Sequence, residues 1–158
     1  MLFGDKGYIE FKYEEQIAKW AEFAGKKGNE ILANPNQLAK WLQCEGTWFV
    51  GVDVLLNDSQ GNFQEVNFPR TFSSLMENIN LQPYHKAQLS VIFPGYPKPR
   101  AGDSEAAFEY RLKRDAAHVD GLLPIGTKKR RYLIEAHGII LGIPLNNTHS
   151  GASPIVQP

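Results

Sequence analysis

Cysteine is almost absent from this chain, as are long apolar runs and any excess of charge of one sign. The only cysteine among the 158 residues is Cys44, which excludes an internal disulfide and a zinc site made of cysteines. No apolar run has the length of a membrane span, and the N-terminus lacks the basic-then-apolar pattern of a signal peptide. We therefore expect a soluble, cytoplasmic protein in a reducing compartment.

The charges balance at 17 basic and 17 acidic residues, so the chain as a whole has no net field that would attract nucleic acid or anionic lipid. The one basic run, Lys128-Lys129-Arg130-Arg131, borders a strand pattern. We interpret it as a solvated turn rather than a phosphate site. The apolar content of 42% is that of an ordinary globular protein, and the length suits one domain with a real core.

Helical periodicity dominates the first forty residues. Between residues 8 and 27, apolar side chains recur at spacings of three and four, which predicts an amphipathic helix with Trp20 on its core face. Gly25 and Gly28 are expected to end this helix or to weaken its last turn. The run Asn34-Pro35-Asn36 is a start signal for a short second helix.

Strand patterns follow the helices. Residues 47–56 are rich in β-branched and aromatic types and predict a strand, after which Gly61 supports a hairpin to a second strand that Pro69 closes. Residues 87–93 alternate as a further strand. The Pro/Gly-rich residues 94–103 exclude a helix or a central strand, and an ordered loop of this length is often a lid or a binding loop.

A short helix that Ser104 caps leads into Ala117-His118-Val119-Asp120-Gly121. In an extended segment, residues two apart point to the same face, so the imidazole of His118 and the carboxylate of Asp120 would converge on one point. That pair is two thirds of the facial triad, two histidines and one carboxylate, that holds non-haem Fe(II). The simpler interpretation is a histidine at a strand edge and an aspartate in a turn. Residues 131–146, which follow, are long and apolar, and their glycines favour extended structure.

This order of elements resembles the Fe(II)/2-oxoglutarate-dependent oxygenases, in particular the phytanoyl-CoA dioxygenase-like part of that superfamily. The resemblance rests on HVDG, on the strand that contains ILGIPLN, and on GASPIV near the end of the chain, and it covers about residues 87–156. It implies a mainly β (α+β) fold, a double-stranded β-helix or jelly roll flanked by N-terminal helices. We expect a single domain, 1–158, with a helix-and-strand N-terminal part (1–80) and an oxygenase-like β-roll core (81–158).

The resemblance also implies a site. His118 and Asp120 would be catalytic residues and ligands of Fe(II), with 2-oxoglutarate as cosubstrate. His137, near a position that lines the cosubstrate pocket in the family, and Arg100, a candidate anion contact, would help to hold it. The distal histidine and the basic residue of the family would be expected just beyond Pro158. Either they are missing and the roll is incomplete at its C-terminus, or His149 supplies the third ligand.

The implied activity is hydroxylation of a small-molecule substrate, with neither nucleic acid nor membrane as a partner. Two alternatives stay open. One is a non-catalytic jelly-roll or cupin-like binding or structural module, and the other is a different metal enzyme that uses His118 and Asp120 with His137 or His149. Because an incomplete roll leaves a strand edge open, pairing with a second copy into a homo-oligomer is also expected.

Overall fold

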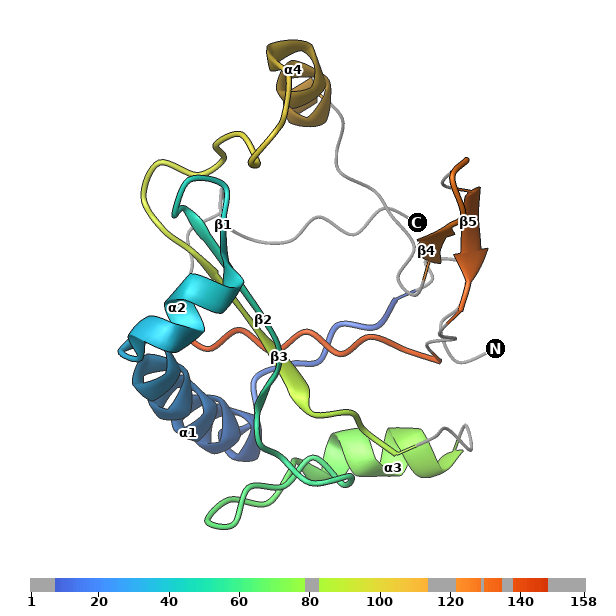
Figure 1. Cartoon of the computed structure of the whole chain (residues 1–158). Coiled ribbons are helices and arrows are strands. Elements are labelled where there is room, and N and C mark those ends of the chain that lie inside the picture. Colours follow the sequence, from blue (N-terminus) through green and yellow to red (C-terminus); the bar gives the residue numbers. More distant parts are fainter. Residues whose placement is uncertain (1–7, 79–82, 114–121, 129, 135–137, 148–158) are drawn as a thin grey trace.

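The computed structural model describes residues 8–78, 83–113, 122–128, 130–134 and 138–147. Four helices and five strands lie in these ranges, and they make the protein an α+β chain with small antiparallel sheets (Figure 1). The described strands form no closed barrel. None of the described helices is both long and apolar enough to span a membrane. In chain order the elements are α1 (Glu15–Leu32), α2 (Pro35–Trp41), β1 (Leu42–Gln43), β2 (Trp48–Leu55), α3 (Arg70–Asn78), β3 (Ala87–Ile92), α4 (Glu105–Lys113), β4 (Leu122–Ile125) and β5 (Arg130–Leu133).

Helix α1 is the predicted amphipathic helix, displaced toward the C-terminus. It begins at Glu15 rather than near residue 8, and it continues to Leu32. The expectation that its glycines end it is therefore wrong. Gly28 is buried, and a Cβ atom there would lie 3.3 Å from Leu89 Cδ2, so this glycine lets strand β3 approach the helix. Its role is close packing, which outweighs the modest cost of glycine in a helix.

Helix α2 begins as the sequence predicts. The side chain of Asn34 accepts a hydrogen bond from the backbone N–H of Asn36 at 2.9 Å, and Pro35 occupies the first turn, where a backbone N–H is not needed. The tight turn after strand β1 includes Cys44, which is buried and is not in a disulfide.

Strands β2 and β3 confirm the two clearest strand predictions, and with β1 they form an antiparallel sheet in the order β1-β2-β3. Trp48 lies opposite Ile92 and Gly51 opposite Leu89, and the register then shifts before Leu55 pairs with Ala87. Asp53 lies in this irregular stretch with φ of +55° and remains exposed, so its carboxylate is not buried in the strand.

One face of this sheet packs against α1 around an aromatic core. The indole N–H of Trp20 donates to the carbonyl of Gly61 at 2.9 Å, which satisfies the one polar group of that side chain. The ring centroids of Phe63 and Phe68 lie 5.2 and 5.3 Å from the ring centroid of Trp20. The buried cluster consists of Trp20, Ala24, Phe49, Leu55, Phe63, Phe68, Phe72 and Leu89.

The predicted second strand of a hairpin near Gly61 is wrong, because residues 56–69 form an irregular loop. Asp58 accepts hydrogen bonds from the backbone N–H groups of Gln60 and Asn62, and Asn62 accepts one from the N–H of Phe68. These side chains satisfy the backbone groups that a strand ladder would otherwise use. The loop nevertheless buries Phe63 and Phe68, the two phenylalanines of the strand pattern.

The C-terminal part of the described chain divides into two kinds of structure. Strands β4 and β5 form a separate two-stranded ribbon with its turn at Gly126. The basic run interpreted as a turn lies only partly in it, because Arg130 and Arg131 belong to β5. The sequence predicts extended structure over residues 131–146. Among the described residues of this range, those of β5 (Arg130–Leu133) form a strand, whereas residues 138–147 are neither helix nor strand. Leu141, Ile143 and Leu145 still pack against the core.

Candidate functional site

Four of the predicted site residues, His118, Asp120, His137 and His149, lie outside the described residues. Their flanks are described. Helix α4 ends at Lys113 and strand β4 begins at Leu122, so a capped helix precedes the H-x-D stretch and an apolar strand follows it. Ser104 caps that helix as predicted, because its hydroxyl oxygen accepts a hydrogen bond from the N–H of Ala107 at 3.2 Å.

Arg100, the fifth predicted site residue, is described and exposed. Its guanidinium carbon lies 5.6 Å from the centroid of the Trp48 ring, a distance at which a cation is attracted to an aromatic face. Its backbone N–H donates to Asp103 Oδ2 at 2.6 Å, and the N–H of Asp103 donates back to the carbonyl of Arg100. The charge of Arg100 is solvent-accessible at the start of a closed turn, and its contact with an anion stays a prediction.

Trp48 holds the Pro/Gly-rich loop, and pattern analysis did not single it out. Its indole N–H donates to Ser90 Oγ at 3.0 Å, and the ring of Tyr96 lies 6.1 Å away. Lys98 of the same loop forms an ion pair with Glu45 at 3.5 Å. The sequence does contain a pattern that could have identified this contact. A tryptophan begins a strand, and a tyrosine and an arginine, side chains that can stack on its ring, lie in the proline-rich loop.

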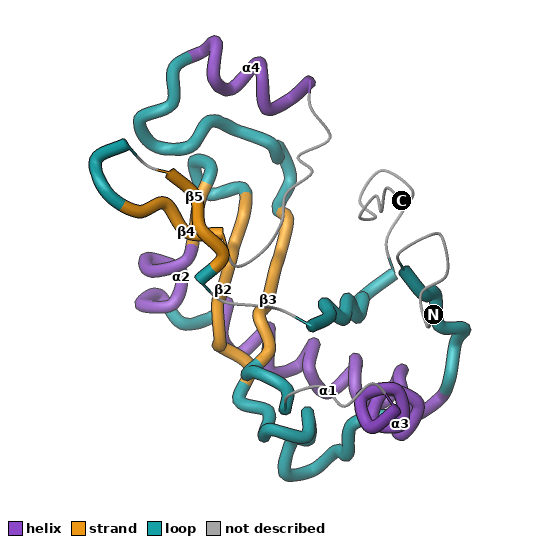
Figure 2. Tube along the Cα trace, turned by 90° about the vertical axis from the view of Figure 1, so that its right-hand side faces the viewer, coloured by secondary structure: helices purple, strands orange, loops and turns teal. Residues whose placement is uncertain are grey.

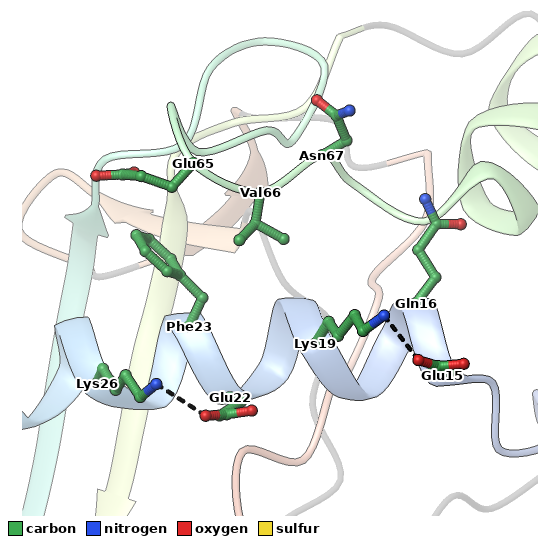
Figure 3. Close-up of a pocket in the computed structure, with 9 residues that line it drawn as sticks. All are labelled: Glu15, Gln16, Lys19, Glu22, Phe23, Lys26, Glu65, Val66 and Asn67. Carbon is green, nitrogen blue, oxygen red and sulfur yellow. Dashed lines mark ion pairs between the residues drawn. The ribbon is translucent and has the colours of Figure 1, made fainter.

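The larger surface groove, of about 690 Å³, lies along α1 beneath residues 65–67 (Figure 3). Phe23 and Val66 provide its apolar part. The ion pairs Glu15–Lys19 (2.7 Å) and Glu22–Lys26 (2.8 Å) lie along the same helix. A hydrogen bond from each lysine, together with its charge, lowers the pKa of its glutamate partner. The four charged side chains that α1 contributes are thus paired, an arrangement typical of a solvated helix face rather than of a catalytic site, and Glu65 is the fifth charged residue of the groove.

A second groove, of about 600 Å³, lies between α2 and the irregular end of β2. Trp41, Val52 and Leu56 line it, and the ammonium of Lys40 lies 4.4 Å from the centroid of the Trp41 ring. Asp53, with its strained backbone, also lines this groove. Glu30 adds a second exposed carboxylate to this groove, and that carboxylate is paired with the ammonium of Lys27 at 3.1 Å.

No group of three or more histidine, cysteine, aspartate or glutamate side chains that could hold a metal ion occurs within the described ranges. The predicted ligands His118, Asp120 and His149 lie outside those ranges, so the metal site stays a prediction. Comparisons of the chain with family models, with curated proteins and with solved structures found no match.

Proposed function

We propose that this protein is a non-haem Fe(II)/2-oxoglutarate-dependent dioxygenase that hydroxylates a small molecule. The observation that carries the proposal is the pair His118 and Asp120, separated only by Val119, in a stretch of chain between a capped helix and an apolar strand. A neutral imidazole and an ionised carboxylate are the ligand types that non-haem Fe(II) takes on one face, with the other face left for substrates.

A double-stranded β-helix, or jelly roll, is the fold that we propose for this enzyme. Two small antiparallel sheets and N-terminal helices packed on one of them are consistent with such a roll. The alternating burial of residues 139–146, with Leu141, Ile143 and Leu145 against the core and their neighbours exposed, is the pattern of a chain with one buried face. Cys44, buried and outside any disulfide, is compatible with the reducing conditions of the cytoplasm.

The proposed roles follow the chemistry of each side chain. His118 and Asp120 hold the metal, and His149 is the candidate third ligand within this chain. Arg100 supplies a permanent positive charge that could pair with a carboxylate of 2-oxoglutarate. His137 is proposed to line the cosubstrate pocket. The metal with its cosubstrate supplies the oxidising power, while the protein orients the substrate and excludes water.

The test is Fe(II) binding under anaerobic conditions, measured by calorimetry on the wild type and on His118→Ala and Asp120→Ala. We expect each variant to lose measurable binding, because two remaining ligands hold the metal poorly. His85→Ala is the matched control, since His85 lies on the exposed loop before β3, outside the predicted ligand set. The wild type should also consume 2-oxoglutarate and form succinate.

Unchanged Fe(II) affinity in His118→Ala would reject the metal site. A folded wild type that binds no metal and consumes no 2-oxoglutarate would instead favour a non-catalytic jelly-roll or cupin-like module. Retained metal binding without 2-oxoglutarate turnover would favour a different metal enzyme. A monomeric mass by light scattering would argue against the homo-oligomer expected from an open strand edge.

A further inference from the structure

The balanced net charge of the chain conceals a segregated distribution. Residues 122–134, which include β4, the turn and β5, contain four basic residues and no acidic one. The rest of the chain therefore carries 13 basic and 17 acidic residues, a net charge of −4 against +4 for this segment. A local field of this kind is invisible in a whole-chain sum, and it attracts anionic surfaces.

The same ribbon exposes large apolar side chains. In its register Leu123 lies opposite Tyr132 and Ile125 opposite Arg130, so these four side chains share one face. Leu123, Ile125 and Tyr132 are 52%, 48% and 49% exposed. Within the described residues, none of the ribbon belongs to the core or packs against it. Exposed apolar side chains gathered in this way usually mark a contact surface.

Arg130 lies on this apolar face and Lys128 in the turn at its end, whereas Arg131 lies opposite Pro124 on the other face of the ribbon. Lys128, Arg130 and Arg131 are exposed, and none of them forms an ion pair with another described residue. The ribbon lies apart from the β1–β3 sheet in Figure 1, and Figure 2, viewed from the side on which the ribbon lies, shows it in front of β2. Within the described part of the chain, these three cations are thus exposed and outside any ion pair.

We propose that the β4–β5 ribbon docks on the surface of an anionic lipid bilayer. Leu123, Ile125 and Tyr132 would enter the interface between headgroups and acyl chains, while Arg130 on the same face and Lys128 in the turn contact lipid phosphates. Arg131, on the other face, adds its positive charge close to the bilayer. This departs from the expectation of no membrane partner, which rested on net charge and on the lack of a spanning segment. Surface docking requires neither a spanning helix nor an excess of charge over the whole chain.

Lipid fits this surface better than nucleic acid does. Tyr132 is the one aromatic side chain that the ribbon could stack on a base, and the remaining apolar side chains are aliphatic. Aliphatic side chains gain little from a phosphate backbone in water but gain from burial at a bilayer interface. An acidic protein surface is the other competitor, and the vesicle experiment separates it from lipid.

The experiment is co-sedimentation of the full chain with vesicles of phosphatidylcholine alone and of phosphatidylcholine mixed with phosphatidylserine. We expect binding to the mixed vesicles that weakens as salt is raised, because salt screens the contact between cations and headgroups. Each basic residue near such a surface strengthens binding about fivefold, so Lys128→Ala/Arg130→Ala/Arg131→Ala should weaken it on the order of 100-fold. The control Lys19→Ala/Lys26→Ala/Lys113→Ala removes three exposed lysines elsewhere and should bind like the wild type.

A second pair of variants tests the apolar contact. Leu123→Ser/Tyr132→Ser should weaken binding roughly tenfold or more, because two apolar side chains no longer enter the interface. Tyr110→Ser/Leu112→Ser makes the same changes on exposed positions of α4 and should leave binding unchanged. Both variants alter exposed side chains, and an unchanged circular dichroism spectrum checks that they fold.

Equal binding to neutral and anionic vesicles, or no binding to either, would overturn the proposal. So would equal losses in the lysine control or in the α4 control. Binding to an RNA homopolymer or to polyglutamate, lost in the triple variant while vesicles remain unbound, would assign the ribbon to a soluble polyanion instead of lipid. None of these outcomes depends on Fe(II) or 2-oxoglutarate, so the dioxygenase proposal is tested separately.

Discussion

Large apolar side chains are distributed very differently in two regions of the described chain. The packed unit consists of α1, α2, α3, β1–β3, the loop 56–69 and residues 83–86 before β3. In this unit Phe49 is fully buried and Leu89 is 3% exposed. In the outer region, residues 94–134, Leu123 and Leu133 are more than half exposed, and no described side chain joins the core. The packed unit uses its apolar side chains for stability, while those of the outer region remain available for contacts beyond it.

The residues that stabilise the fold and the residues proposed to carry the chemistry therefore lie in different regions of the chain. In the sequence, the H-x-D stretch belongs to the outer region, between α4 and β4. Arg100 belongs to the same region, and its guanidinium lies over the ring of Trp48 in the packed unit. Because no described side chain of the outer region packs in the core, substitutions there should change binding with little effect on global unfolding. Substitutions in the packed unit should unfold the chain first and affect binding only as a consequence.

The largest expected effect comes from the centre of the packed unit. Phe49→Ala removes a fully buried ring that lies between α1 and the sheet, and such truncations typically cost about 3–5 kcal/mol. Leu133→Ala removes an exposed side chain in the outer region and should change the free energy of unfolding by about 0.5 kcal/mol or less. Urea denaturation followed by circular dichroism measures both. Similar losses in the two variants would show that the ribbon packs against the rest of the protein.

Two glycines with positive φ sharpen the comparison. A Cβ atom on Gly61 would lie 2.7 Å from the ring of the buried Phe68, whereas one on Gly102 would meet nothing within 4 Å. Gly61→Ala should cost about 2–4 kcal/mol, from backbone strain plus overpacking, and Gly102→Ala about 1 kcal/mol or less, from strain alone. Urea denaturation of the two variants compares their losses of unfolding free energy. Equal losses would mean that the loop at Gly61 is no more tightly packed than the loop at Gly102.

The sequence predicts most where the pattern depends on local chemistry. Asn34 caps α2, Ser104 caps α4, and the alternation of residues 87–93 places Leu89 and Val91 on the core face of β3. Each of these features needs only neighbouring residues or one buried face. It can therefore be identified without knowledge of the tertiary fold.

The predictions that failed depend on contacts between distant residues. Gly28 remains inside α1 because Leu89, 61 positions away, packs against it. The loop after β2 replaces a strand because the side chains of Asp58 and Asn62 bind its backbone. For the candidate site the sequence supplies the ligand types and their spacing. The convergence of those side chains depends on a fold that the spacing alone does not determine.

Asn57 tests how strongly the packed unit depends on a buried polar group. Its side chain donates to the carbonyls of Asp58 and His85 and accepts from the N–H of Ala87 at 2.7 Å, so it joins the end of β2 to the start of β3. Asn57→Ala should cost about 1–3 kcal/mol, because these backbone groups lose their partner. The exposed Asn146→Ala is the matched control and should cost little. A neutral Asn57→Ala would mean that water replaces the side chain.

The smallest effect is a pH dependence carried by the packed unit. The ring of Tyr84 lies 4.9 Å from that of Phe68, its hydroxyl donates to the carbonyl of Phe72, and burial raises the pKa of Tyr84 to about 12. Because the pKa is higher in the folded state than its ordinary value of 10.0, the neutral form favours folding. That contribution is complete below pH 10 and is lost as the pH rises from 10 to about 12.

The expected loss is about 1 kcal/mol, since Tyr84 is only partly buried and solvent screens part of the shift. Lysines and other tyrosines titrate in the same range, so the measurement is the difference in unfolding free energy between the wild type and Tyr84→Phe across this window. The difference should shrink as the pH rises through this window. A constant difference would mean that solvent reaches the hydroxyl of Tyr84 as freely in the folded protein as in the unfolded chain.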